Sequence, residues 1–286
     1  MERKLMEKDR RLGEILSQAG PLAVAFSSGV DSTFLLDRAA EQLGKGAIAI
    51  SAVSAWVPKR EAVEADAFCR ERGIRHLIIS LTEEEIPGFT ENPPDRCYLC
   101  KKKLFSKLQD RASKEGFPLV VEGSNMDDLG DFRPGIRALS ELGIRSPLRE
   151  AGLYKAEIRE LSRERNLPTW SKPSFACLAS RFVYGEEITR EKLSMVERAE
   201  DLLLSLGFSQ MRVRIHGNLA RIEVERGEIE RIAAGEMRER ISSALKEMGF
   251  AYVTLDLLGY RVGSMNEVLG KSREQNDGIE PPIKDI

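Results

Sequence analysis

Short apolar runs alternate with longer amphipathic stretches along the first 170 residues of the chain. Each apolar run is bounded by turn residues, which is typical of a strand buried in a parallel sheet. The predicted strands are 21–26, 46–53, 74–81 and 118–123. The predicted helices are the one that precedes residue 21 and those at 32–43, 59–73, about 98–115 and 154–166. This alternation predicts an α/β fold, an open parallel sheet with helices on both faces, and ligands bind such sheets at the carboxyl ends of the strands.

The pattern changes after this region. Proline and polar residues gather in 167–185, where we expect a domain boundary. A helix, two strands joined by a Gly-Asn turn, two more helices and a last strand near 251–257 then predict a small α+β domain. The predicted parts are a nucleotide-binding α/β domain at 1–170, a cysteine-bearing linker at 171–188, a substrate or oligomerisation domain at 189–262, and a polar, disordered tail at 263–286.

Composition excludes several classes of protein. The 286 residues are 42% hydrophobic and 31% charged, which is ordinary for a globular protein, and the net charge of −2 argues against a broad nucleic-acid footprint. No apolar run approaches the roughly 20 residues that a membrane span needs. The first residues, MERKLMEKDRRL, indicate a charged helix and not a signal peptide, so we expect a cytoplasmic location.

The stretch AFSSGVDSTFLL, residues 25–36, joins the first strand to the next helix. It places small side chains, hydroxyls and backbone N–H groups at a helix N-terminus, an arrangement that binds anions. The residues concerned are Ser27, Ser28, Gly29, Asp31, Ser32 and Thr33. Because it lacks the lysine of the G-x-x-x-x-G-K-[ST] loop, it is not predicted to hold a transferring γ-phosphoryl group. The alternative is a serine N-cap, in which Ser27 or Ser28 satisfies the first N–H groups of an ordinary helix.

The same stretch resembles the S-G-G-x-D-S signature of the PP-loop ATP pyrophosphatases, with Ser28 in place of the first glycine. The resemblance implies that the turn grips pyrophosphate as it leaves, while a substrate oxygen attacks the α-phosphorus of ATP. Asp31 would then help to hold Mg²⁺, whose charge offsets that of the departing group. The implied cofactors are ATP and Mg²⁺.

Cysteine chemistry is the next candidate. Four cysteines are too few for a disulfide framework in a chain of this length. Cys97 and Cys100 form a C-x-x-C pair at the start of a predicted helix, where the helix dipole and the cations Arg96, Lys101 and Lys102 are expected to stabilise a thiolate.

The other two cysteines differ in setting. Cys177 lies among small residues in KPSFACLASRF, and Cys69 falls on the apolar face of a predicted helix, where we expect it to be buried. Three interpretations of Cys97, Cys100 and Cys177 stay open: a [4Fe–4S] cluster with one open iron, thiol or persulfide chemistry without a cluster, and structural zinc. A histidine-rich metal site is excluded because the chain has only two histidines.

Five segments together resemble one PP-loop family, the ATP-dependent sulfur transferases called LarE, which act in the biosynthesis of the nickel-pincer cofactor of lactate racemase. The segments span nearly the whole chain and are FSSGVDST, NPPDRCYLCKKKLF, EGSNMDDLGDFRPG, KPSFACLASRFVYG and VRIHGNLARIEV. The resemblance implies adenylation of the carboxylates of pyridinium-3,5-biscarboxylate mononucleotide and their conversion to thiocarboxylates. In members with one matching cysteine, here Cys177, that thiol gives up its sulfur and becomes dehydroalanine. Members with three cysteines carry a [4Fe–4S] cluster, and this chain has all three.

Further site residues follow from the resemblance and from strand alternation. Arg212 and Arg214 share one face of a strand, where guanidinium groups suit a phosphate or a carboxylate, unless the face is simply a solvated one. The family match adds substrate-site and ATP-site candidates, which are Ser180, Arg181, Glu200, Glu223 and Gly123. Asp127, Asp131 and Arg133 could order a loop over ATP and metal, although aspartate-rich loops are also common turns.

Two other functions compete with the sulfur transferase. One is a tRNA-thiolating PP-loop enzyme, which the net charge of −2 disfavours. The other is a nonenzymatic ATP-binding or iron–sulfur carrier, which the presence of both the turn and the cysteine loop disfavours. The expected partners are a small nucleotide, further copies of the chain in a homo-oligomer, and transiently a sulfur donor or another cofactor-biosynthesis protein, with neither nucleic acid nor membrane.

Overall fold

The computed structural model describes residues 3–130, 134–173 and 176–266. The chain forms two compact units, the first from Met1–Cys177 with Glu187–Arg190, the second from Leu178–Glu186 and from Glu191 onward. Asp131, Arg133 and most of the predicted tail lie outside the described residues. In the described part of the chain, every helix is too short or too polar to span a bilayer.

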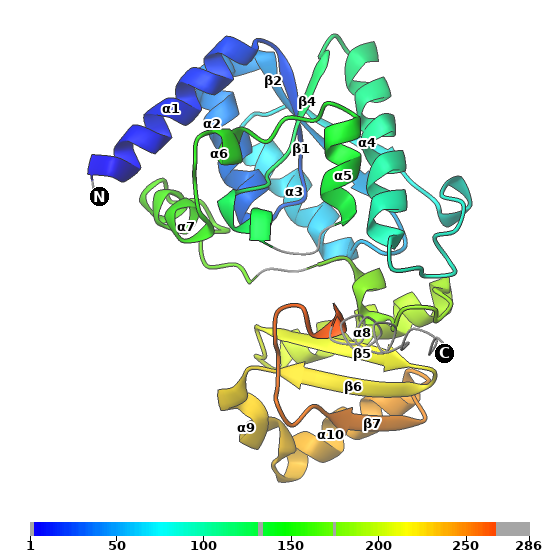
Figure 1. The fold of residues 1–286 in the computed structure, drawn as a ribbon. Helices are drawn as coiled ribbons and strands as arrows, with labels where there is room; N and C mark the ends of the chain where they lie inside the picture. The colour runs from blue at the N-terminus through cyan, green and yellow to red at the C-terminus, as the bar shows by residue number, and fades with distance from the viewer. Residues whose placement is uncertain (1–2, 131–133, 174–175, 267–286) are drawn as a thin grey trace, which may run out of the picture. The chain divides into compact units, whose positions relative to one another are not determined.

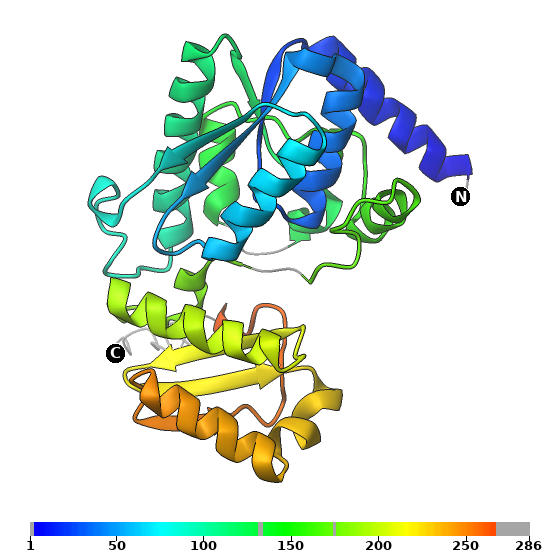
Figure 2. The same cartoon turned by 180° about the vertical axis from the view of Figure 1, so that it is seen from behind.

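The first unit is built on a parallel sheet with the strand order β3-β2-β1-β4, shown in Figures 1 and 2. Its strands are β1 (Leu22–Ala25), β2 (Ala47–Val53), β3 (His76–Ser80) and β4 (Leu119–Val121). The central strand β1 pairs with β2, where Ala25 lies opposite Ile50, and with β4, where Val24 lies opposite Val121. The predicted α/β fold with an open parallel sheet is confirmed.

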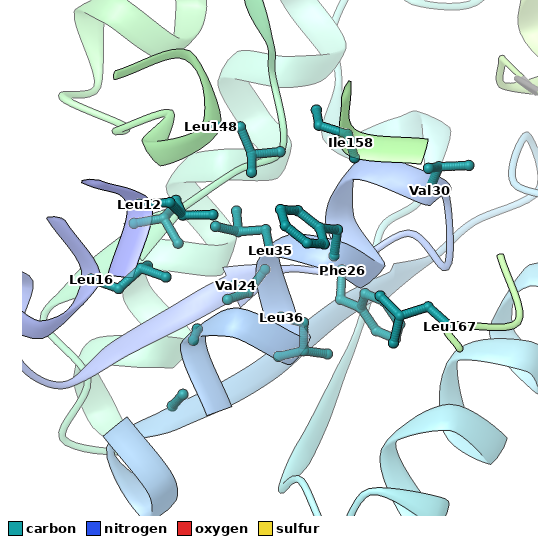
Figure 3. Packing of buried hydrophobic residues seen from close by; sticks show 14 of the residues in the cluster. Leu12, Leu16, Val24, Phe26, Val30, Leu35, Leu36, Leu148, Ile158 and Leu167 are labelled. Carbon is teal, nitrogen blue, oxygen red and sulfur yellow. The ribbon is translucent and has the colours of Figure 1, made fainter. Parts of the chain in front are cut away.

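Helices cover both faces of this sheet, and an apolar core lies between each face and its helices. Its helices are α1 (Arg3–Ala19), α2 (Val30–Leu43), α3 (Lys59–Glu71), α4 (Arg96–Lys114), α5 (Pro134–Glu141), α6 (Pro147–Glu150) and α7 (Lys155–Glu164). Alternation along β1 divides the cores: Val24 faces α1, α2, α3, α6 and α7, whereas Ala23 faces α4 and α5. Figure 3 shows the first core, in which Leu12, Leu35 and Leu148 pack around Val24.

The second unit is a small α+β fold, also as predicted. Strands β5 (Met211–His216) and β6 (Leu219–Val224) form a hairpin whose turn residue Gly217 has φ +59, and β7 (Tyr252–Leu255) runs parallel to β6. The helices are α8 (Arg190–Ser205), α9 (Ile229–Ala233) and α10 (Gly235–Glu247). In Figures 1 and 2, α8 and α10 lie on one side of this sheet, and the segment that follows β7 crosses the other.

Candidate functional site

A cavity of about 520 Å³ opens at the carboxyl ends of β1, β2 and β4, the edge where the sequence predicts a ligand. One part of its wall is polar and includes Ser27, Gly29, Asp31, Ser32 and Gly123. Another part is apolar and includes Val57, Ala62, Ala65, Leu104 and Leu108. A site with an apolar wall and a few convergent polar groups is typical of a small-molecule ligand pocket.

The turn between β1 and α2 lies in this wall with the helix N-terminus uncapped. Gly29 is the N-cap of α2, and no side chain caps the first turn. The serine hydroxyls bind each other instead, since Ser27 Oγ and Ser32 Oγ are 3.1 Å apart and Ser32 Oγ donates to the carbonyl of Gly29 at 3.3 Å. The serine N-cap alternative is therefore wrong. N–H groups left without a side-chain partner at a helix N-terminus favour an anion there.

The two other predicted turn residues do not line the cavity. Ser28 is 2% exposed and Thr33 is fully buried. Ser28 has φ +52, a left-handed conformation that costs most residues about 1–2 kcal/mol and glycine almost nothing. Glycine, which the PP-loop signature has at this position, would adopt this conformation with less strain than Ser28 does.

Gly123 brings the end of β4 against the first turn of α2. A Cβ at this position would lie 3.1 Å from the backbone nitrogen of Ser32 and 3.2 Å from Cβ of Asp31. Both atoms belong to the helix start that borders the cavity, so neither can swing aside as a flexible side chain could. A Cβ here would require the helix start to move by a few tenths of an ångström, so this close approach favours glycine.

Asp31, the predicted Mg²⁺ ligand, is held by residues distant in sequence. Asn125 Nδ2 donates to Asp31 Oδ1 at 3.2 Å, and the ammonium of Lys155 forms an ion pair with Asp31 Oδ2. Asp127 accepts the backbone N–H of Lys155 at 2.7 Å, and its own N–H donates to Asn125 Oδ1 at 2.9 Å. Asp127 therefore fixes the loop against the start of α7, an ordering role like the one that the sequence suggests.

A second lysine reaches the turn from the cysteine-bearing segment. Lys172 Nζ lies 3.0 Å from the carbonyl oxygen of Ser28 and also pairs with Glu64. The anion turn thus has no lysine of its own, but Lys155 and Lys172 bring ammonium groups to it. Sequence reasoning missed both because their closeness to the turn arises only on folding, although Lys172 stands in the stretch quoted for Cys177.

The three candidate cysteines share one electrostatic environment. Burial, with smaller contributions from the neighbouring Cys177 and Cys97, raises the pKa of the Cys100 thiol to about 12, against the opposite effects of a hydrogen bond with Trp56 and of Arg96. The predicted Cys100 thiolate is therefore corrected to a neutral thiol, because burial outweighs the helix start and the nearby cation. Within the described ranges, no group of three or more His, Cys, Asp or Glu side chains is set to hold a metal ion.

The lysines expected to stabilise a thiolate have other contacts. Lys102 donates to Glu141 at 2.7 Å and to the Tyr98 hydroxyl at 2.9 Å. Lys101 lines the cavity instead, and so does Ala176, which directly precedes Cys177. Cysteine-bearing segments thus border the cavity that the anion turn also lines. Cys69 is 1% exposed and buried as predicted, and burial raises its pKa to about 12.

In the second unit, two predicted substrate residues form a fully buried ion pair. Arg181 and Glu200 are 0% exposed and are joined by two bonds of 2.8 Å, while Glu200 also accepts the N–H of Val213 at 3.0 Å. Burial raises the pKa of Glu200, but Arg181 and Val213 outweigh burial and leave that pKa below its usual value. Glu200 is therefore not the surface glutamate that its residue type suggests.

The second pair of predicted arginines is also buried, so the solvated-face alternative is wrong: Arg212 is 3% exposed and Arg214 is 6% exposed. Arg214 binds Glu223 through two nitrogens at 3.2 and 3.0 Å and donates to the Ser180 carbonyl at 2.8 Å. The guanidinium of Arg212 lies over the ring of Tyr260, 4.9 Å from its centroid. Burial, with smaller contributions from Arg181 and Arg214, lowers the pKa of Arg212 to about 10, against the opposite effects of Tyr260 and Glu200.

Comparison with known proteins gives several related chains. The chain is 43% identical over 267 residues to an uncharacterised protein of Synechocystis sp., covering 93% of this chain and 100% of that one. It is 36% identical over 270 residues to pyridinium-3,5-bisthiocarboxylic acid mononucleotide synthase of Lactiplantibacillus plantarum, covering 94% of this chain and 97% of that one. It is 25% identical over 201 residues to a glutamine-hydrolysing GMP synthase chain of Thermoplasma volcanium, covering 64% of this chain and 63% of that one. No protein-family model matches the chain.

Proposed function

The chain belongs to the LarE family of ATP-dependent sulfur transferases, and on this premise we propose that it adenylates the carboxylates of pyridinium-3,5-biscarboxylate mononucleotide and converts them to thiocarboxylates. One observation carries the proposal: a single cavity is lined by the uncapped helix N-terminus and by Lys101 and Ala176, the neighbours of Cys100 and Cys177. The proposed pyrophosphate site and the proposed source of sulfur would thus border the same space.

In the first reaction, a carboxylate oxygen attacks the α-phosphorus of ATP, and the bond from that phosphorus to the bridging oxygen breaks. Pyrophosphate leaves with the electron pair, held by the N–H groups of the first turn of α2. Lys155 and Lys172 would offset its charge, because their ammonium groups already contact Asp31 and Ser28 at the turn. Asp31 would bind Mg²⁺ through its carboxylate oxygens, which are the ligands that this ion prefers.

The adenine base has a candidate binding site at the edge of β2. The ladder between β1 and β2 ends at Ala25 and Ile50, and the next bond runs from the N–H of Phe26 to the carbonyl of Ile50. Because successive residues of a strand direct their backbone groups to opposite sides, the N–H and C=O of Ala52 point past the end of β1. Ala52 lines the cavity beside apolar side chains, so this edge suits a flat base with one donor and one acceptor.

The second reaction needs a sulfur nucleophile that attacks the acyl carbon of the adenylate and displaces AMP. Three thiolates are a donor set for a [4Fe–4S] cluster with one open iron. Cys97, Cys100 and Cys177 would have to move together to hold such a cluster, which when bound would supply an exchangeable sulfide. Without it, the Cys177 thiolate would form a thioester and displace AMP. Loss of the Cα proton and cleavage of the Cβ–S bond would then leave the thiocarboxylate and dehydroalanine.

Two experiments test this function. ATP–pyrophosphate exchange should depend on the pyridinium biscarboxylate mononucleotide and not on tRNA; exchange that requires tRNA would contradict the proposal. Anaerobic purification with iron and sulfide analysis, followed by intact-mass measurement after turnover, separates the sulfur sources. About four irons per chain and an unchanged mass support the cluster. Loss of one H₂S at Cys177 in iron-free protein supports the sacrificial route and rejects the cluster.

A further inference from the structure

A buried chain of hydrogen bonds runs from β3, at the edge of the parallel sheet, through β2 to the anion turn. It starts at His76, whose side chain is 6% exposed, and continues through Ser51, which is 7% exposed. His76 Nε2 lies 2.8 Å from Ser51 Oγ, and Ser51 Oγ donates to the carbonyl of Phe26 at 2.7 Å. Phe26 directly precedes Ser27, the first residue of the turn. Two buried polar side chains thus connect an edge strand to the backbone at which the turn begins.

The direction of this chain follows from the one proton of the Ser51 hydroxyl. Because Ser51 donates that proton to Phe26, it accepts a hydrogen bond from His76, so Nε2 of the ring is protonated. Burial lowers the pKa of His76, against the opposite effect of Asp66, so the ring is uncharged at neutral pH. Nδ1 is then without a proton, and this buried atom has no hydrogen-bond partner among the described residues. Asp66 Oδ1, at 3.9 Å from Nδ1, is too distant for one, so the bond to Ser51 orients the ring.

The chain ends on the peptide group between Phe26 and Ser27, which is held from both sides. Its oxygen accepts from Ser51, and its N–H donates to Ser32 Oγ at 3.3 Å. Because a peptide group is planar, a bond that fixes the direction of the oxygen also fixes that of the N–H. Ser27 and Ser32 both line the cavity. The Ser51 hydroxyl therefore orients the backbone from which the anion turn starts.

The surroundings of this chain are apolar. The His76 ring lies edge-on to the Phe26 ring with 6.3 Å between centroids, and the Phe26 ring lies 5.7 Å from that of Phe68. Apolar side chains at positions 51 and 76 would avoid the cost of burying polar groups there. The hydrogen bonds of the chain therefore contribute a fixed orientation more than they contribute stability.

We propose that Ser51 and His76 are positioning residues for a phosphate group bound at the anion turn. Ser51 orients the peptide group before Ser27, and His76 keeps the Ser51 hydroxyl in the orientation that reaches Phe26. That the phosphate group belongs to the pyrophosphate leaving ATP rests on the proposed function.

Nitrogen-15 NMR of the imidazole rings tests the direction of the chain, because the sequence has only two histidines, His76 and His216. His216→Gln removes the signals of the second ring. We expect the His76 ring to carry its proton on Nε2 at neutral pH. A ring that is protonated on Nδ1 would make Ser51 the donor to His76, would leave the Phe26 carbonyl without that proton, and would overturn the proposal.

Equilibrium binding of inorganic pyrophosphate in the presence of Mg²⁺, measured by titration calorimetry, tests the positioning role. Ser51→Ala removes the donor to Phe26, so we expect Kd to rise about fivefold. His76→Leu should raise Kd about as much, and it gives a second variant if Ser51→Ala folds poorly. His76→Gln should keep Kd within about twofold of wild type, because its amide N–H can replace the ring Nε2–H. Lys107→Met is the matched control: it removes a bond of 2.7 Å to the carbonyl of Ser80, at the other end of β3, and should leave Kd unchanged.

A double-mutant cycle and thermal melting separate positioning from a role in stability. In a Ser51→Ala background, His76→Leu should have no further effect on Kd, because the hydroxyl that His76 orients is gone. Full additivity, a wild-type Kd for both single variants whatever their Tm, or no pyrophosphate binding by the wild-type chain would each overturn the proposal. The proposed function fails separately, if the pyridinium biscarboxylate supports no ATP–pyrophosphate exchange while pyrophosphate binding still depends on Ser51.

Discussion

Replacing Gly123 by alanine is a sharp test of the anion turn, because it adds one methyl group against the start of α2. The new Cβ would lie 3.1 Å from the Ser32 nitrogen and 3.2 Å from Asp31 Cβ, with the Asp31 carbonyl carbon at 3.3 Å. Contacts this short must be relieved by a few tenths of an ångström of movement. Since two of these atoms are backbone, the helix start itself moves, together with its anion-facing N–H groups.

The expected cost has two parts. Overpacking destabilises a fold by about 1–3 kcal/mol, and for a unit of this size each kcal/mol lowers Tm by about 2–4 °C. Loss of one charge-assisted hydrogen bond to the phosphate costs about 1.5–3 kcal/mol, or roughly 10- to 100-fold in affinity. We therefore expect Gly123→Ala to bind pyrophosphate at least tenfold more weakly and to show a matching rise in the KM for ATP.

Gly227 provides the matched control. Its φ is not positive, and a Cβ there meets no atom within 4 Å, so Gly227→Ala should change neither binding nor KM and should leave Tm unchanged or slightly raised. Calorimetric titration of pyrophosphate, exchange kinetics and thermal melting measure these quantities for both variants. If Gly123→Ala has wild-type affinity for pyrophosphate and a wild-type KM for ATP, the first turn of α2 is not the phosphate site.

Other substitutions and reagents test the remaining contacts. Arg181→Met should lower the free energy of unfolding by about 3–5 kcal/mol, because it leaves the fully buried Glu200 without its cation; an unchanged urea midpoint would contradict this. In the wild-type chain, the depressed pKa of Glu200 means that the pair stabilises the fold at neutral pH and that this stability is lost as pH falls below about 4, which acid unfolding measures. Cys69 and Cys100, with pKa values of about 12, should react with iodoacetamide at pH 8 far more slowly than free cysteine in metal-free protein, as followed by peptide mass spectrometry. Lys172→Met should weaken pyrophosphate binding about tenfold and Lys172→Arg less, and equal binding by both variants and the wild type would exclude a phosphate contact.

The parallel sheet and its principal helices could be predicted because their signals are local. A buried strand is indicated by a short apolar run between turn residues. Each helix of the first unit with ten or more residues is indicated by apolar residues that recur at helical spacing. The helices α5 and α6 were not predicted. They are eight and four residues long, start at Pro134 and Pro147, and depend on tertiary packing of Leu139 and Leu148 into the two cores.

The candidate site also has a part that the sequence predicts and a part that it does not. The anion turn is contiguous, so its residues and its place after the first strand can be deduced from the sequence. The ammonium groups at the turn come from positions 155 and 172, and their partners Asp31 and Ser28 lie more than a hundred residues earlier. The expectation for Cys100 failed for a related reason. The helix start and nearby cations are visible in the sequence, but the burial that raises its pKa is not.

Two buried arginines that strand alternation treats as equivalent also differ in their contacts. Arg212 and Arg214 share one face of β5, as period two requires, yet the partners that distinguish them come from other elements. Arg214 donates to Glu223 on β6 and to the hydroxyl of Ser264, 50 residues away. It also donates to the Ser180 carbonyl, so it stabilises the fold of this unit. Arg212 donates to the Met211 carbonyl at 2.6 Å and lies over the ring of Tyr260, and burial is the largest of the effects that lower its pKa. The two arginines therefore differ in contacts that no pattern along β5 could predict.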